Sequence, residues 1–217
     1  MNPMMMGHGN FLIDLIFNLL FVIVSFVIFY KTKEIYELTK YNGIKYFRYS
    51  FLFLGIGYFF RASTLLLRLF VDNFFMKNHF CTRLFWAFPI NFFGILAIFY
   101  LFLSLDSKKG FSEKYEYLIY LFALLVSLLF YLTHSYNMLI IIQLLSLILV
   151  IVIHVFKNRN NIQKMFVIYS LLLVFWILNL FLMLPVKIFS LYTIVFVQIV
   201  SLTIMLYIFF KVFKWIK

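Results

Sequence analysis

The chain is dominated by repeated apolar runs of about 18 to 25 residues, the length that crosses the ~30 Å hydrocarbon core of a bilayer as a helix. Residues 139–156, LIIIQLLSLILVIVIHVF, are apolar on every side. A transmembrane β-strand would instead alternate apolar and polar residues over about ten positions. The runs therefore predict an all-α membrane protein, with the lipid bilayer as its first partner.

The composition agrees with this class. Hydrophobic residues make up 66% of the 217 residues and charged residues 12%, against about half and a quarter in a soluble domain. The net charge is +12, and the basic residues that produce it lie between the apolar runs. They do not form the aromatic-rich basic patch of a nucleic-acid-binding protein, so no nucleic acid partner is expected. A single cysteine, Cys81, excludes an intrachain disulfide and a cysteine-only metal cluster.

The runs predict one domain, residues 1–217, folded as a seven-transmembrane-helix bundle. The predicted helices lie near residues 10–30, 46–70, 84–105, 116–133, 138–157, 164–185 and 189–211. We expect the first helix to be an anchor and to continue past the membrane, because Lys33 and Glu37 are four residues apart and Asn42-Gly43 can stop a helix.

Lysine and arginine set the predicted orientation, since they collect in cytoplasmic loops. Fourteen of the 19 basic residues fall on one side of the predicted bundle: Lys31, Lys33, Lys40, Lys45, Arg48, Lys108, Lys109, Lys114, Lys157, Arg159, Lys164, Lys211, Lys214 and Lys217. Four fall on the other side, and Arg61 lies inside a span. We therefore expect a multi-pass protein of the cell membrane, with the N-terminus outside and the C-terminus cytoplasmic.

Arg61 is the most unusual residue, because it lies about 20 Å above the cytoplasmic end of its helix at 1.5 Å per residue. An arginine at that depth needs a partner or water, and it indicates a functional site. Asp14, the one acid inside a predicted span, lies about 24 Å up the first helix. We predict a pair between Asp14 and Arg61, with Arg68 as the competing partner.

Five amides lie at a similar depth, about 18 to 21 Å from the cytoplasmic ends of their helices: Asn18, Asn91, Gln143, Asn179 and Gln198. If they face inward, they form with Asp14 and Arg61 a polar pocket in the outer half of the membrane, a common place for ligands between helices. The alternative is that the amides only hydrogen-bond between helices and hold the bundle together.

Several chemistries have no residues to carry them. The sequence contains no HExxH zinc motif, no glycine-rich phosphate loop and no arrangement that would build a nucleophile within the membrane. We predict no enzyme activity, no catalytic residue, no cofactor and no metal site. The last helix has no lysine in its middle, which excludes a retinal Schiff base.

Residues 30–61, YKTKEIYELTKYNGIKYFRYSFLFLGIGYFFR, resemble the first two helices of prokaryotic, archaeal-type seven-helix sensor-like modules that occur alone or fused to signalling kinases. The resemblance implies a seven-helix membrane module and no particular ligand residue. Because the sequence holds no kinase, signalling would need a separate cytoplasmic or membrane protein partner.

Three functions fit these observations. The leading hypothesis is a receptor-like or sensor-like module that binds a small ligand, such as an anion, in the outer-half pocket around Arg61. The alternatives are a small transporter for a solute or ion, whose amide layer forms the central site, and a membrane scaffold subunit that associates through its lipid-facing surface.

Overall fold

A computed structural model describes residues 8–70, 79–105, 113–133, 141–146, 148–149, 152, 165–183 and 191–216. Apart from the turn at Lys40 and Tyr41, all of these residues are helical. The named helices are α1 (His8–Thr39), α2 (Asn42–Phe70), α4 (His79–Leu105), α5 (Glu113–Thr133), α7 (Met165–Met183) and α8 (Leu191–Ile216). Every predicted helix therefore contains helical residues, and residues 141–146 and 148–149 fall in the fifth predicted span.

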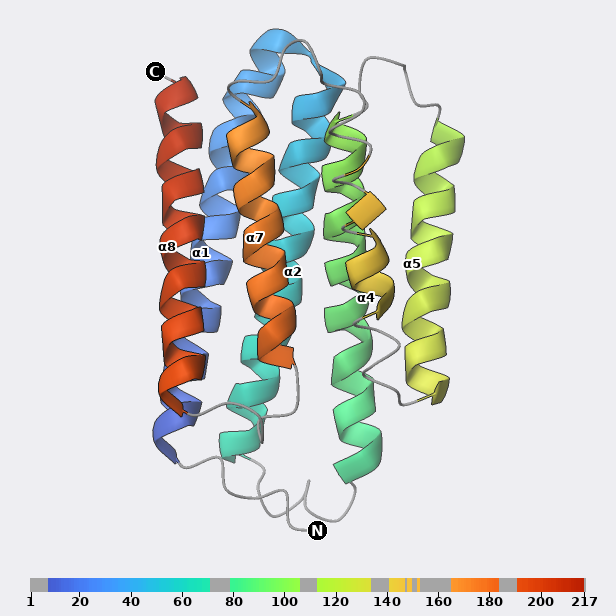
Figure 1. The fold of residues 1–217 in the computed structure, drawn as a ribbon. Helices are drawn as coiled ribbons and strands as arrows, with labels where there is room; N and C mark the ends of the chain where they lie inside the picture. The colour runs from blue at the N-terminus through green and yellow to red at the C-terminus, as the bar shows by residue number, and fades with distance from the viewer. Residues whose placement is uncertain are drawn as a thin grey trace.

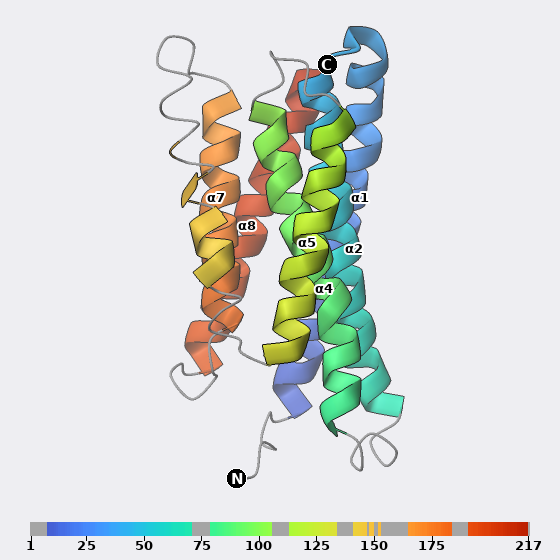
Figure 2. The same ribbon diagram turned by 90° about the vertical axis from the view of Figure 1, so that its right-hand side faces the viewer.

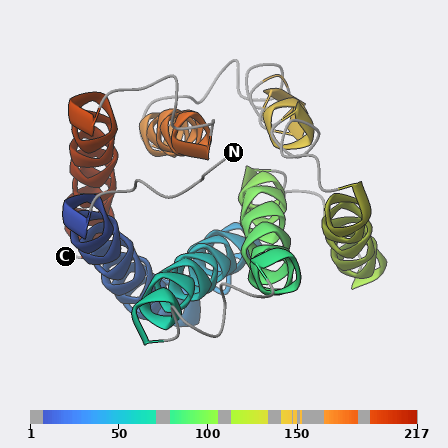
Figure 3. The ribbon, with the colours of Figure 1, turned by 90° about the horizontal axis from the view of Figure 1, so that it is seen from below.

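The helices stand side by side and alternate in direction along the chain (Figure 1). Figure 2, turned by 90°, shows that they run nearly along one axis. Seen from below, they follow one another around a ring, with residues 141–146 and 148–149 between α5 and α7 (Figure 3). Contacts between α1 and α8 close the ring. The start of α1 and the end of α8 lie at opposite ends of the bundle.

The turn between α1 and α2 corrects the predicted helix stop. α1 ends at Thr39, where Lys40 has a left-handed φ of 51° and its N–H donates to Tyr36 O at 2.8 Å. This single left-handed residue closes the helix end. The Asn42-Gly43 pair is not the stop, because both residues lie in the first turn of α2.

The predicted polar end of α1 is otherwise as expected. Lys33 and Glu37 form an ion pair at 3.5 Å. Arg48 of α2 covers α1, with its guanidinium carbon 4.9 Å from the centre of the Phe29 ring and 5.6 Å from that of Tyr36. The Arg48 contacts therefore join the first two helices near their shared turn.

The helices are apolar on their outer faces as well as in the core. Phe51, Leu96 and Phe175 are among the fully buried side chains. The exposed apolar side chains include Ile16, Ile23, Phe59, Leu121, Phe196 and Phe210. A helix that is apolar all round is expected in a large core or in a membrane.

Within the described residues, three helices are long and apolar enough to cross a membrane: Phe11–Thr39, Asn42–Leu67 and Tyr192–Lys214. Shorter apolar stretches occupy Phe88–Ser104, Glu116–Leu132 and Ser170–Leu180. The length and composition of α1, α2 and α8 are therefore those of membrane-spanning helices.

Candidate functional site

All five amides of the predicted layer are buried. Their side chains are between 2% and 6% exposed: Asn18, Asn91, Gln143, Asn179 and Gln198. Asp14 and Arg61 are half-buried. The amides therefore face the interior, as required for a pocket, but they do not all meet in one place.

One group lies between α1 and α8. The Gln198 amide donates a hydrogen bond to the Asp14 carboxylate, and Asn18 donates to the backbone oxygen of Asp14 at 2.7 Å. Ser201 lies one turn from Gln198 on the same helix and is fully buried. This group joins the first and last helices of the ring.

The predicted pair between Asp14 and Arg61 is wrong. Among the described side chains the ion pairs are Lys33–Glu37 and Lys45–Glu116. The depth of Asp14 matches that of Arg61, but Asp14 is on the side of α1 that faces α8. The side chain of Arg68, the competing partner, lies outside the described residues.

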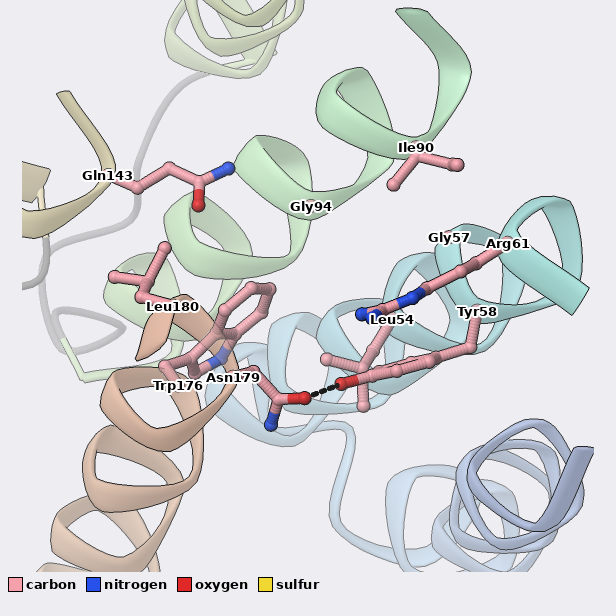
Figure 4. Close-up of a pocket in the computed structure, with 10 residues that line it drawn as sticks. All are labelled: Leu54, Gly57, Tyr58, Arg61, Ile90, Gly94, Gln143, Trp176, Asn179 and Leu180. Carbon is pink, nitrogen blue, oxygen red and sulfur yellow. Dashed lines mark hydrogen bonds between the residues drawn. The ribbon is translucent and has the colours of Figure 1, made fainter. Parts of the chain in front are cut away.

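The second group surrounds a cavity of about 40 Å³ (Figure 4). Its walls come from α2, α4, α7 and the segment around Gln143. The lining residues are Leu54, Gly57, Tyr58, Arg61, Ile90, Gly94, Gln143, Trp176, Asn179 and Leu180. Three of the seven predicted site residues, Arg61, Gln143 and Asn179, are thus brought together here. Asn91 is buried in α4 but is not one of the lining residues.

Hydrogen bonds hold one wall of the cavity. The Tyr58 hydroxyl donates to Asn179 Oδ1 at 2.6 Å, and Asn179 Nδ2 donates to Phe175 O at 2.8 Å. The Tyr58 ring packs against Phe21 of α1, with ring centres 4.8 Å apart. Because both Tyr58 and Asn179 are satisfied by each other, this wall is preorganised and its amide and hydroxyl groups are already partnered.

Arg61 is different. It extends from α2 across the pocket toward the side formed by α7 (Figure 4). Within the described part of the chain it has neither an ion pair nor a hydrogen bond, and none of the ten lining residues is acidic. An unpaired guanidinium that is partly removed from water is unfavourable. The cavity therefore offers uncompensated positive charge and several N–H donors.

Two glycines leave room for the cavity. A methyl group added at Gly94 would lie 3.8 Å from Gln143 Nε2 and 3.9 Å from Trp176 Cη2. At Gly57 it would lie 3.8 Å from the Phe93 Cβ. All three distances are ordinary contacts, so a methyl group would fit at either position but would occupy part of the pocket.

The sequence predictions missed Tyr58 and Trp176. A usable signal existed, because each lies three residues before a predicted site residue, Arg61 and Asn179 respectively, and so shares its helix face. With 23% of the chain aromatic, single aromatic residues carried little weight.

The described residues contain no group of three or more His, Cys, Asp or Glu side chains that could hold a metal ion.

Together the fold and the pocket define an all-helical bundle with apolar outer faces and a small, positively charged cavity. The chain is 30% identical over 192 residues to an uncharacterized protein of Archaeoglobus fulgidus, a match that covers 83% of this chain and 85% of the relative. The chain belongs to the same family as that archaeal protein. No family model matches the chain, and no solved structure matches it significantly.

Proposed function

We propose that the chain crosses the cell membrane seven times, with its N-terminus outside and its C-terminus in the cytoplasm. The support is the alternation of the helices, the opposite ends reached by α1 and α8 (Figure 1), and the strong bias of basic residues toward one side of the predicted bundle. Lys45 and Glu116, whose side chains are paired at 3.8 Å, would then lie at the cytoplasmic end.

The single cysteine makes this orientation testable. A membrane-impermeant thiol reagent added to intact cells is expected to label Cys81, which precedes the third predicted span on the outer side. In a Cys81→Ser, Ser107→Cys variant, labelling is expected only after the membrane is permeabilised. The reverse pattern would mean that the bundle is inserted the other way round.

We further propose that the chain is a non-enzymatic, sensor-like membrane module that binds a small anion in the pocket around Arg61. The observation that carries this proposal is the unpaired Arg61 guanidinium in a cavity without acidic lining residues. A bound anion would supply the countercharge that the described protein groups do not. Hydrogen bonds to the anion, which Gln143 can add, would make such a site selective.

Trp176 gives the pocket a built-in reporter, since it lines the cavity and is only 9% exposed. In a Trp86→Phe, Trp215→Phe background, Trp176 is the one remaining tryptophan. Iodide quenches tryptophan emission on contact, so binding in the pocket is expected to give saturable quenching. Arg61→Gln should abolish the saturable component, because it removes the charge that holds the anion.

The result that would contradict the anion site is weak, linear quenching that is the same with Arg61 and with Arg61→Gln. The matched control is Phe59→Leu, which changes an exposed side chain two residues away on α2 and should leave the quenching curve unchanged.

The alternative function for the same pocket is transport of the anion. Uptake of the quenching anion into vesicles containing the protein, with a rate lowered by Arg61→Gln, would assign the chain as a transporter. Saturable binding without uptake would support sensing. A scaffold role would be favoured if neither binding nor uptake depended on Arg61.

A further inference from the structure

Gln143 has an acceptor without a donor. Its side chain is 2% exposed and lines the cavity, yet Oε1 has no hydrogen-bond partner among the described residues. Figure 4 shows the amide nitrogen directed toward α4 and the oxygen toward the side formed by Trp176 and Leu180. A buried carbonyl oxygen without a hydrogen-bond donor is unfavourable. A ligand that donates to this oxygen would form the hydrogen bond that no described protein group provides.

Arg61 needs the opposite kind of partner, a hydrogen-bond acceptor. Its guanidinium has donors only and requires an acceptor, with negative charge preferred. In the described part of the structure Tyr58 and Asn179 meet neither demand, because the hydrogen bonds that they form are to each other and, from Asn179, to Phe175 O. The ligand that completes this cavity is therefore an anion that also carries one hydrogen-bond donor.

The size of the cavity narrows the choice. One water needs about 10–15 Å³ of such a volume, so the 40 Å³ cavity has room for roughly three waters or for a compact ion of similar extent. A planar oxyanion with four heavy atoms is of the right size.

On these grounds we infer that the ligand is a small protonated oxyanion of the bicarbonate type. Its charged oxygens bind the Arg61 guanidinium, and its O–H donates to Gln143 Oε1. The inference rests on the proposed function, because it names the anion for the same site.

Nitrate provides a matched probe, since it is also a planar monoanion of four heavy atoms but has no O–H to donate. The experiment is competition with iodide for Trp176 in the variant that retains only this tryptophan, at mildly alkaline pH where bicarbonate is the dissolved species. Bicarbonate is expected to displace iodide at a concentration about tenfold lower than nitrate, the factor that corresponds to one net hydrogen bond. A site with positive charge alone would favour nitrate, which gives up its hydration more easily.

Gln143→Met separates the contribution of the Arg61 charge from that of the hydrogen bond to Gln143, because it keeps the approximate shape of the side chain and removes both polar atoms. Saturable iodide quenching is expected to remain, and the preference for bicarbonate is expected to vanish. Equal or stronger displacement by nitrate in the chain with Gln143 intact would overturn the bicarbonate inference and leave the anion site standing. Absence of saturable iodide quenching in the protein with Gln143 intact would count against the proposed function. The comparison with Gln143 intact decides the inference even if Gln143→Met does not fold.

Discussion

Gly55→Leu is expected to lower the free energy of unfolding by about 1–3 kcal/mol, the usual cost of overpacking a tight interface. α1 and α2 pack closely at Gly55. A Cβ at position 55 would lie 3.2 Å from Ser25 Cβ and 3.4 Å from Phe26 Cε2. The first of these partners is next to the α1 backbone and cannot swing away, so the remaining leucine carbons would force the two helices apart.

The separation would also reach the pocket, because α2 carries both Tyr58 and Arg61. The measurement is unfolding of the purified protein by titration with a denaturing detergent. Gly57→Ala is the control, since its new Cβ would meet only ordinary contacts at 3.8 Å and alanine favours a helix by up to about 1 kcal/mol over glycine. If Gly55→Leu were as stable as Gly57→Ala, α1 and α2 would not pack as described.

Gln198→Leu is expected to destabilise the bundle by about 1–3 kcal/mol, because it leaves the Asp14 carboxylate without its amide donor between α1 and α8. The double variant Asp14→Leu, Gln198→Leu should recover most of this loss. Replacing both partners of a buried polar pair by apolar residues is often nearly neutral, whereas removing one partner leaves an unsatisfied group.

The same detergent titration measures this cycle. Thr203→Ala is the control on α8, since the Thr203 hydroxyl donates only to Ile199 O of its own helix and is exposed. A double variant that is less stable than Gln198→Leu alone would show that Asp14 has a second role, and the hydrogen bond to Gln198 would not be its main contribution at the α1–α8 contact.

The helices could be predicted because each long apolar run is bounded by polar residues, and this pattern depends on the chain alone. The burial of Asn18 and Gln198 could be predicted for a related reason, since amides in an apolar run are stabilised by facing inward. Depth along a helix follows directly from residue number. These properties are local.

The partner of Asp14 could not be predicted from the same reasoning. Two residues at one depth meet only if their helices are turned toward each other, and the rotation of an apolar helix about its axis is set by packing. α1 carries apolar residues on all sides, so its sequence did not show that Asp14 faces α8 and that Phe21 faces Tyr58. The split of the predicted polar layer into two groups follows from these rotations.

The most direct test of the central claim is an experimental structure of the protein with bromide, whose anomalous scattering locates a bound anion. We expect a bromide peak inside the cavity, beside the Arg61 guanidinium and within reach of Gln143, and no such peak in Arg61→Gln. Two results would contradict the account. One is an Arg61 side chain that points to lipid, and the other is a cavity without bromide at a bromide concentration equal to the iodide concentration that saturates quenching of Trp176.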